Sequence, residues 1–470
     1  MRLTGYRKGD DPSSLKSEEK WMKDPRFVGL SLVDDLIYMF FRERNAQENP
    51  DIDPWISRIG RVCKNDQGGS RQRLLTKWTT FLKARLLCNN PVDNVHFNRI
   101  EDAFIYKFPH DSEARVYGVF SSNWKGTAVC VYSMKEISDL FGCSVFKDFK
   151  GSIPTDPRPG TCVNNTKVLP DQVLAVVEDY PEMESWIHPI GRNPLVINYQ
   201  NRFKKIVVDS VVGPSGNVSR VLYVATGDGK VQKVLETDHS IFVIAELMLL
   251  KEPASILSMS LDSNRVSAKK FLYVTSAKEL VRFPLVQCEK YDGTCGGCVQ
   301  ARDPYCGWDS QIKKCVPVTP DSKNVFQDLE KGDSCPQAKA ESWFPPQGAD
   351  WFSSWLEIPP NWPVLPLPLE ERLPVYLSCP KQSYHAEYSW RFNGHKQLPC
   401  SKNDDNCLLF LSGLSESDVG SYECISNERG VEDRHAVYLI QDNGGSSIYL
   451  SRVALSSVPM AVICLIWQCF

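Results

Sequence analysis

Short apolar runs, several of them alternating with polar residues, recur between residues 26 and 287. Examples are LIYMFF (Leu36 to Phe41), RVYGVF (Arg115 to Phe120) and AVCVYS (Ala128 to Ser133). Runs of this length and period are typical of strands that bury one or both faces. Long amphipathic helical patterns are scarce, so the pattern predicts a mainly β fold for this part of the chain.

An internal repeat narrows this prediction. The segment VLYVATGDGKVQKV (Val221 to Val234) is echoed by FLYVTSAKELVRFPL (Phe271 to Leu285), with Leu222 and Leu272 separated by 50 positions. Each copy has the form strand, tight turn, strand, and the glycines around Asp228 accept the positive φ of such a turn. Repeats of this spacing predict a β-propeller built from four-stranded blades.

One stretch does not follow the strand pattern. Leu169 to Pro189 contains DQVLAVVEDY and MESWIHP, which favour one or two short helices. We therefore expect a helical insertion from a blade at about residues 165–200.

The 17 cysteines are clustered, with six between Cys288 and Cys335 and four between Cys379 and Cys424. Residues 288–335 carry little hydrophobic sequence, so three disulfides are the expected substitute for a core. A zinc site or redox pair at Cys295 and Cys298 is the alternative, although it leaves two cysteines over. Dense cysteine clusters suit an oxidising compartment. Glycosylation sequons at Asn164 and Asn217 suit the same compartment.

The C-terminal third contains a second type of β domain. Residues 336–373 form a Pro- and Trp-rich linker, and residues 374–441 predict an immunoglobulin-like β-sandwich. In the latter, Trp390 follows Cys379 by eleven positions, and Tyr422 lies two before Cys424, the position of a tyrosine corner.

Residues 442–470 resemble a GPI-attachment signal, because small residues and a short polar spacer precede an apolar tail. Asn443 is the expected attachment residue. A short single span or a buried final strand is the alternative. The first residues contain no apolar segment of a secretory signal, so we expect sequence upstream of this chain in the complete protein.

Charge and motifs exclude several functions. The net charge is -3 and no basic stripe is interleaved with aromatic residues, so nucleic acid is not expected as a partner. We find no nucleophile elbow, zinc-protease motif, Walker loop or dinucleotide fingerprint, and the histidines lack ligand spacing. The sequence therefore predicts no enzyme, no cofactor and no metal site. A propeller glycosidase is the enzyme alternative, and it requires a charged pocket on the propeller axis.

Several phrases, taken together with this domain order, resemble the semaphorin family. They are DPYCGWD (Asp303 to Asp309), YMFFRER (Tyr38 to Arg44), KWTTFLKARLLC (Lys77 to Cys88), VYGVFSSNW (Val116 to Trp124) and PRPGTC (Pro157 to Cys162). With the C-terminal tail, they are most similar to the GPI-anchored class 7 semaphorins.

The resemblance implies that residues 1–287 are the C-terminal part of a seven-bladed sema propeller, followed by a PSI module and one immunoglobulin domain. It implies a homodimeric ligand on the outer face of the plasma membrane. Such a ligand binds a plexin and guides axon growth, cell migration and immune-cell activation. A receptor ectodomain with sema and PSI modules is the alternative.

The resemblance also implies a set of disulfides. The expected pairs are Cys63–Cys162, Cys88–Cys130, Cys288–Cys306, Cys295–Cys335, Cys298–Cys315, Cys379–Cys424 and Cys400–Cys407. Cys143 is left without a partner, and we expect it to be a buried thiol, with an intermolecular disulfide as the alternative.

One loop suggests a second partner. Lys64-Asn65-Asp66 stands where class 7 members can carry an Arg-Gly-Asp integrin motif. Recognition of that kind needs a cation and an aspartate whose carboxylate reaches a metal ion from an exposed turn. We therefore consider β1-integrin binding at this loop, against a plain surface loop as the alternative.

Overall fold

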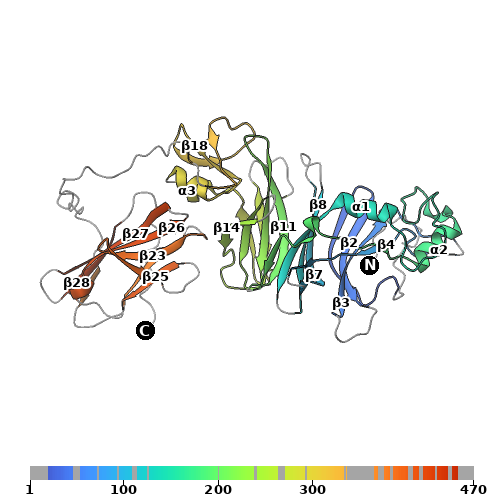
Figure 1. Ribbon diagram of the computed structural model, residues 1–470, viewed down its shortest axis with the longest axis horizontal. Coiled ribbons are helices and arrows are strands. Elements are labelled where there is room, and N and C mark those ends of the chain that lie inside the picture. Colours follow the sequence, from blue (N-terminus) through green and yellow to red (C-terminus); the bar gives the residue numbers. More distant parts are fainter. Residues whose placement is uncertain are drawn as a thin grey trace. The chain divides into compact units, whose positions relative to one another are not determined.

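The chain forms two compact units in the computed structural model (Figure 1). The first holds the chain up to Gln287 with Asp303–Cys306 and Pro317–Val325, and the second holds the remainder. The structure describes residues 20–45, 53–70, 73–92, 95–107, 114–123, 126–199, 201–237, 241–262, 270–291, 294–332, 335, 365–368, 375–381, 385–400, 406–411, 416–428, 431–442 and 447–453.

Four antiparallel sheets follow one another along the first unit, and each pairs strands that are neighbours in sequence. They are formed by β1 (Arg26–Val33), β2 (Leu36–Arg44), β3 (Trp55–Cys63) and β4 (Leu82–Arg85); by β7 (Arg99–Tyr106), β8 (Arg115–Ser121), β9 (Thr127–Ser133) and β10 (Val196–Asn198); by β11 (Phe203–Val212), β12 (Val218–Thr226), β13 (Val231–Glu236) and β14 (Ile241–Leu247); and by β15 (Ser258–Leu261), β16 (Phe271–Thr275) and β17 (Leu280–Pro284). The short strands β5 (Asn89–Asn90) and β6 (Val95–His96) form a separate pair.

The first strands of consecutive sheets lie beside one another. β1 contacts β7, β7 contacts β11, and β11 contacts β15. This succession of sheets, joined at their first strands, is the arrangement of propeller blades. The mainly β prediction and the propeller prediction are confirmed for this unit.

The 50-residue repeat corresponds to equivalent positions of two blades. Leu222 lies on β12 and Leu272 on β16, each the second strand of its sheet, and both are 0% exposed. Leu222 is paired with Val208 and Val234, and Leu272 with Leu261 and Phe283. The repeat thus marks the buried centre of each blade.

The insertion lies between β9 and β10 of the second sheet and starts earlier than the sequence indicated. It contains α1 (Met134–Cys143), η1 (Thr166–Val168), α2 (Asp171–Asp179) and η2 (Ile190–Arg192). α1 was not predicted; the Ser133 hydroxyl caps it by accepting from the backbone N–H of Glu136. Of the one or two helices expected over Leu169–Pro189, the structure contains one, α2, and MESWIHP is instead extended and pairs with the first sheet.

That extended segment runs along the outer edge of the first sheet. The Lys83 amide donates to the Pro181 carbonyl at 2.8 Å, and the Met183 amide donates to the Lys83 carbonyl at 2.9 Å. The Ile187 amide donates to the Arg85 carbonyl at 2.9 Å. The insertion therefore satisfies backbone groups that an edge strand would leave unpaired.

A buried ionic cluster holds the insertion in this position. The Glu43 carboxylate lies 2.7 Å from Nε of Arg58 and 2.9 Å from Nζ of Lys83, and Arg58 also contacts Glu182 of the insertion at 2.8 Å. Burial alone would raise the pKa of Glu182, but Arg58 and Lys83 bring that pKa below its ordinary value. The cluster joins β2, β3, β4 and the insertion.

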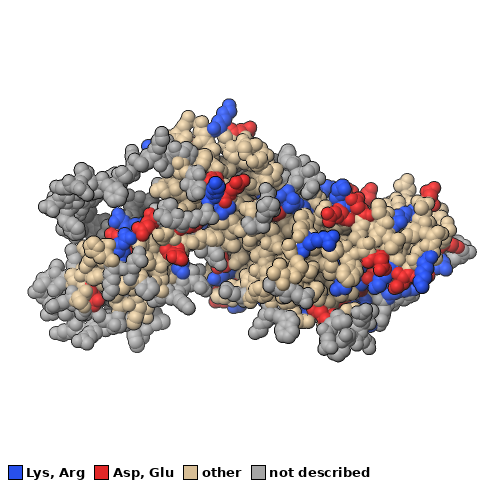
Figure 2. All heavy atoms as spheres, viewed as in Figure 1, with Lys and Arg blue, Asp and Glu red and all other residues tan. Residues whose placement is uncertain are grey.

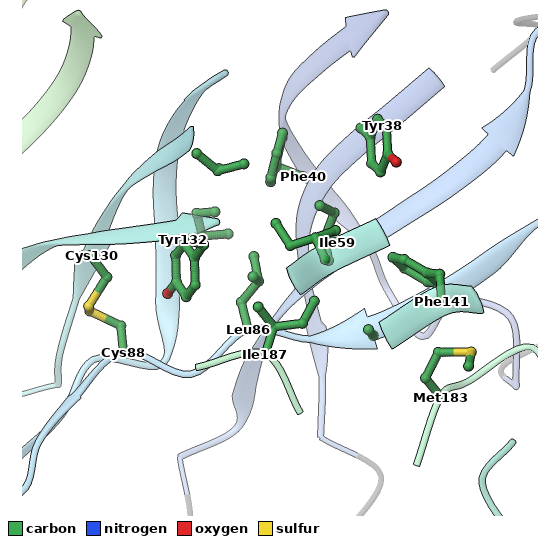
Figure 3. Packing of buried hydrophobic residues seen from close by; sticks show 14 of the residues in the cluster. Tyr38, Phe40, Ile59, Leu86, Cys88, Cys130, Tyr132, Phe141, Met183 and Ile187 are labelled. Carbon is green, nitrogen blue, oxygen red and sulfur yellow. A yellow bond between two sulfur atoms is a disulfide. The ribbon is translucent and has the colours of Figure 1, made fainter. Parts of the chain in front are cut away.

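The main hydrophobic core lies between the first two sheets and the insertion (Figure 3). Tyr38 and Ile59 come from the first sheet, Tyr132 from the second, and Phe141 from α1; each is at most 2% exposed. The Cys88–Cys130 disulfide lies within the same cluster. Three stretches distant in sequence thus share one core.

A second buried polar cluster fixes the Asp303–Cys306 segment to the blades. Nζ of Lys233, on β13, lies 2.5 Å from the Asp303 carboxylate and 4.7 Å from the centre of the Tyr305 ring. The Tyr305 hydroxyl donates to Asp209 of β11 at 2.6 Å, and Lys270, just before β16, contacts the same carboxylate at 2.9 Å. Burial is the largest cause that raises the pKa of Tyr305 well above its ordinary value, and nearby groups, including Asp209, raise it further.

The cysteine module has few regular elements. They are η3 (Cys288–Tyr291), α3 (Cys295–Gln300), β18 (Cys306–Asp309), β19 (Lys314–Pro317) and β20 (Val325–Phe326). β18 lies between β19 and β20 in a small sheet.

The C-terminal part of the second unit contains two sheets, one of six strands in the order β21-β28-β27-β26-β23-β24 and one of β22 and β25. The elements are β21 (Leu365–Pro368), β22 (Val375–Pro380), β23 (Glu387–Phe392), β24 (Lys396–Pro399), β25 (Asn406–Leu411), η4 (Glu416–Asp418), β26 (Gly420–Glu428), β27 (Val431–Asp442) and β28 (Ser447–Val453). The Cys379–Cys424 disulfide joins the two sheets beside Trp390, which is 0% exposed. The Tyr422 hydroxyl donates to the Asp418 carbonyl at 3.0 Å.

Replacing Lys233 with methionine should destabilise the first unit by about 3–5 kcal/mol, because Asp303 then remains buried without its cation. Chemical denaturation would measure this change. The Lys278–Glu252 pair, with side chains 75% and 72% exposed, supplies the control, and Lys278→Met should alter stability by less than about 1 kcal/mol. Equal effects of the two substitutions would contradict the role of the buried pair.

Candidate recognition surface

An arginine-rich cluster surrounds Trp55, the first residue of β3. The guanidinium carbons of Arg26, Arg42 and Arg44 lie 5.0, 5.8 and 5.4 Å from the centre of its ring. Strand register causes this, because Arg26 is opposite Arg42 on β1 and β2, and Arg44 is opposite Trp55 on β2 and β3. We call these four residues the Trp55 cluster.

Carboxylates neutralise part of the cluster. The ion pairs at and beside it are Arg42–Glu101 at 2.9 Å, Arg44–Asp24 at 3.4 Å and Arg99–Asp53 at 3.8 Å. Arg26 is exposed and has no acidic partner among the residues that the structure describes. Elsewhere, positive and negative side chains are interspersed on the face seen in Figure 2, without a large field of one sign.

The chemistry of the Trp55 cluster suits binding of a protein surface. Tryptophan and arginine are the side chains most enriched at the energetic centres of protein interfaces. The Arg44 side chain is 53% exposed and that of Arg42 is 20% exposed, so a partner can reach donors already held over the ring. A cation–π contact of this kind contributes about 0.5–1 kcal/mol at exposed sites.

This cluster was not predicted from the sequence. The alternation of Arg42 and Arg44 within YMFFRER places both on one face of a strand, which was a usable signal. Their meeting with Arg26 and Trp55 depends on the register between three strands, which the sequence alone does not specify.

The structure pairs most cysteines of the described residues. It contains the disulfides Cys63–Cys162, Cys88–Cys130, Cys295–Cys335, Cys298–Cys315, Cys379–Cys424 and Cys400–Cys407. Cys288 and Cys306 are also disulfide-bonded. Cys143 is free and exposed at the end of α1, so the expectation that its thiol is buried is wrong.

Both sequon asparagines are exposed. Asn164 lies before η1. The threonine of its sequon, Thr166, is 0% exposed, and its hydroxyl donates to the Gly68 carbonyl at 2.8 Å. Asn217 lies in the turn between β11 and β12. Their use for glycosylation stays a prediction. Asn443 lies outside the described residues.

The loop considered for integrin binding does not present its aspartate. Lys64 and Asn65 are exposed, but Asp66 is 0% exposed. Its carboxylate accepts hydrogen bonds from the backbone amides of Gly68, Thr79 and Thr80 at 2.8–3.0 Å, and from both threonine hydroxyls. The expectation that Asp66 reaches a metal ion on an integrin is therefore wrong, because this carboxylate organises its own loop.

Two kinds of feature are absent from the described part of the chain. No group of three His, Cys, Asp or Glu side chains gathers there closely enough to hold a metal ion. No helix found there is both long and apolar enough to cross a membrane.

Comparison with known families identifies two modules. The Sema domain model matches residues 100–263, and the Plexin repeat model matches residues 287–336. Human Semaphorin-7A is 34% identical over 446 residues, which covers 91% of this chain. The chain belongs to the semaphorin family. Mouse Semaphorin-7A is 33% identical, and this semaphorin spans 63% of the length of either relative.

Solved structures of other semaphorins share this fold. Extracellular domains 1-2 of Drosophila Semaphorin 1a match with a TM-score of 0.59 and 28% identity, covering 69% of each chain. A structure of Drosophila Plexin A in complex with Semaphorin 1b matches with a TM-score of 0.58 and 29% identity, again covering 69% of each chain. The predicted sema-type propeller and PSI module are thereby confirmed as the family's fold.

Substituting Asp66 with alanine should destabilise the semaphorin by roughly 3 kcal/mol or more, because several buried donors lose their acceptor together. Thermal or chemical unfolding would measure the loss. Lys64→Ala, two positions away and exposed, should change stability by no more than about 0.5 kcal/mol. A stable Asp66→Ala variant with reduced adhesion to integrin would instead restore the recognition hypothesis.

Proposed function

We propose that this semaphorin is a cell-surface or extracellular ligand that acts by binding a plexin. The observation that carries the proposal is its similarity to the solved complex of Drosophila Plexin A with Semaphorin 1b. The match includes sequence as well as fold, at 29% identity over 69% of the chain. Guidance of axon growth, cell migration and immune-cell activation are the roles we expect such a ligand to serve.

The alternatives from the sequence receive less support. A receptor ectodomain would share the sema and PSI modules, but the relatives reported above are semaphorins. Semaphorins are signalling ligands, so we propose no catalytic activity. Disulfides in both units suit an extracellular or cell-surface location.

Within the propeller, we propose the Trp55 cluster as part of the plexin-binding surface. It combines an aromatic face with arginines that are held in place by their own ion pairs. Prior ordering of this kind reduces the entropy lost when a partner binds. The acidic residues next to it would also disfavour partners of the wrong charge pattern.

For the C-terminal sandwich we propose an immunoglobulin-like domain followed by a GPI anchor at Asn443. The disulfide beside Trp390 and the Tyr422 hydrogen bond support the domain assignment. β28 pairs with β27 and β21, so cleavage after Asn443 would remove β28 and leave β27 at a sheet edge. Homodimerisation stays a prediction from family resemblance.

Trp55→Ala should weaken binding to plexin ectodomains by about tenfold or more, if this residue is at the energetic centre of the interface. Surface plasmon resonance with a panel of plexin ectodomains would measure the dissociation constants. Trp186→Ala is the matched control. Trp186 is 49% exposed and also lies beneath an arginine, Arg85 at 4.6 Å, but it belongs to the insertion and not to the Trp55 cluster.

The two parts of the proposal fail separately. If no plexin binds the unmodified chain, plexin recognition itself is refuted. If a plexin binds and both tryptophan variants bind equally well, only the assignment to the Trp55 cluster is refuted.

The GPI anchor predicts that a phosphatidylinositol-specific phospholipase releases the protein from the surface of cells that express it. Release would be measured by immunoblotting of the medium. Asn443→Gln should reduce surface delivery, whereas Asn217→Gln, which removes a sequon, should leave phospholipase release unchanged. Retention of the unmodified protein after enzyme treatment would rule out the anchor.

A further inference from the structure

A pair of arginines lies between the first sheet and the insertion, away from the Trp55 cluster. Arg61 is on β3, and Arg158 is in the insertion after α1. The Arg61 guanidinium lies 4.6 Å from the ring centre of Phe141, and that of Arg158 lies 5.2 Å from the ring centre of Phe146. Both rings belong to the main core, so the two cations sit at its edge.

Neither arginine has an acidic partner among the described residues. Arg61 is only 8% exposed, and its hydrogen-bond partner is the Tyr38 hydroxyl. Arg158 donates to the Ser144 carbonyl. The Nε atoms of both arginines are buried without an acceptor. A guanidinium carries five N–H donors, so a single tyrosine hydroxyl can accept from only part of Arg61.

Other buried cations in this unit differ in this respect. Arg58 and Lys83 each lie within 2.9 Å of Glu43, and Lys233 lies 2.5 Å from Asp303. Burying a charge without a counter-ion is costly, and native proteins normally avoid it by pairing. An unpaired Arg61 beside a second cation is therefore the exception that needs a physical reason.

The electrostatics agree with a missing anion. Burial lowers the pKa of Arg61, and the proximity of Arg158 lowers it further, while the Tyr38 hydroxyl acts in the opposite direction. Burial likewise lowers the pKa of Arg158, which lies within electrostatic reach of the exposed Cys143 thiol. The Asp34 carboxylate, which acts on the pKa of Tyr38, is itself paired with Lys107 at 2.7 Å.

We propose that Arg61 and Arg158 form a binding site for a sulfate or phosphate group, entered from the side of Arg158 and Cys143. Two guanidiniums can bind such an oxyanion with several charge-assisted hydrogen bonds. The group is either a free inorganic ion or a substituent of a sulfated sugar chain. This site is separate from the Trp55 cluster and does not depend on plexin binding.

The site is tested by thermal unfolding of the full chain in about 0–20 mM sodium sulfate. Sodium chloride at equal ionic strength is the reference. The unmodified chain should show a saturable rise in Tm of about 2 °C or more. Arg61→Met and Arg158→Met should lose this rise. Arg85→Met, which removes an arginine stacked on Trp186, is the matched control and should keep it.

A second measurement remains informative if a variant folds poorly. The rate of Cys143 alkylation, followed by peptide mass spectrometry, is compared for anionic iodoacetate and neutral iodoacetamide. Sulfate should slow the reaction with iodoacetate and leave that with iodoacetamide unchanged, and Arg158→Met should abolish the difference. Arg158→Lys, which keeps the charge, should preserve it in part.

The outcomes are decisive in both directions. An equal Tm rise in all variants, or none in the unmodified chain, together with alkylation insensitive to sulfate, overturns the proposal. A rise with sulfate but none with heparin oligosaccharides supports the site with a free ion as its ligand. A rise at lower concentrations of heparin oligosaccharides supports a sugar-borne sulfate.

Discussion

The buried contact between Lys233 and Asp303 is the constraint on which the end of the propeller depends. Asp303 begins the short segment Asp303–Cys306, which belongs to the propeller unit although the residues on either side of it do not. Through Tyr305 and Asp209 the same cluster reaches β11, and through Lys270 it reaches the start of β16. Hydrophobic packing alone would permit many placements of a short segment, whereas a desolvated ion pair permits few.

A second ionic cluster performs a comparable task at the other end of the unit. Glu43, Arg58, Lys83 and Glu182 hold an extended part of the insertion against β4. The insertion thereby becomes part of the sheet. This explains why residues 181–187 are extended although their composition favoured a helix: backbone pairing with β4 outweighs local propensity.

Much of the fold was predictable from the sequence, because it is encoded in local periodicity. The 50-residue repeat identified the blade centres, and Cys379, Trp390 and Cys424, singled out by their spacing, are all buried in one cluster of the C-terminal sheets. Features that depend on contacts distant in sequence were missed. The burial of Asp66, for example, depends on Thr79 and Thr80. α1 was missed for a different reason, since it follows β9 directly, without an intervening turn residue. The Trp55 cluster depends on strand register. Charge pattern alone therefore did not reveal that the Asp66 carboxylate is buried.

The fourth sheet has a consequence for handling the protein. Among the described residues it contains three strands where the first three sheets contain four, and its last strand, β17, carries Leu280 with 66% of its surface exposed. An edge strand of this kind can pair with an extended segment of another molecule. Such pairing is bimolecular, so its extent rises with protein concentration and with time in storage. Dilution therefore reduces the extent to which this edge acts as a template.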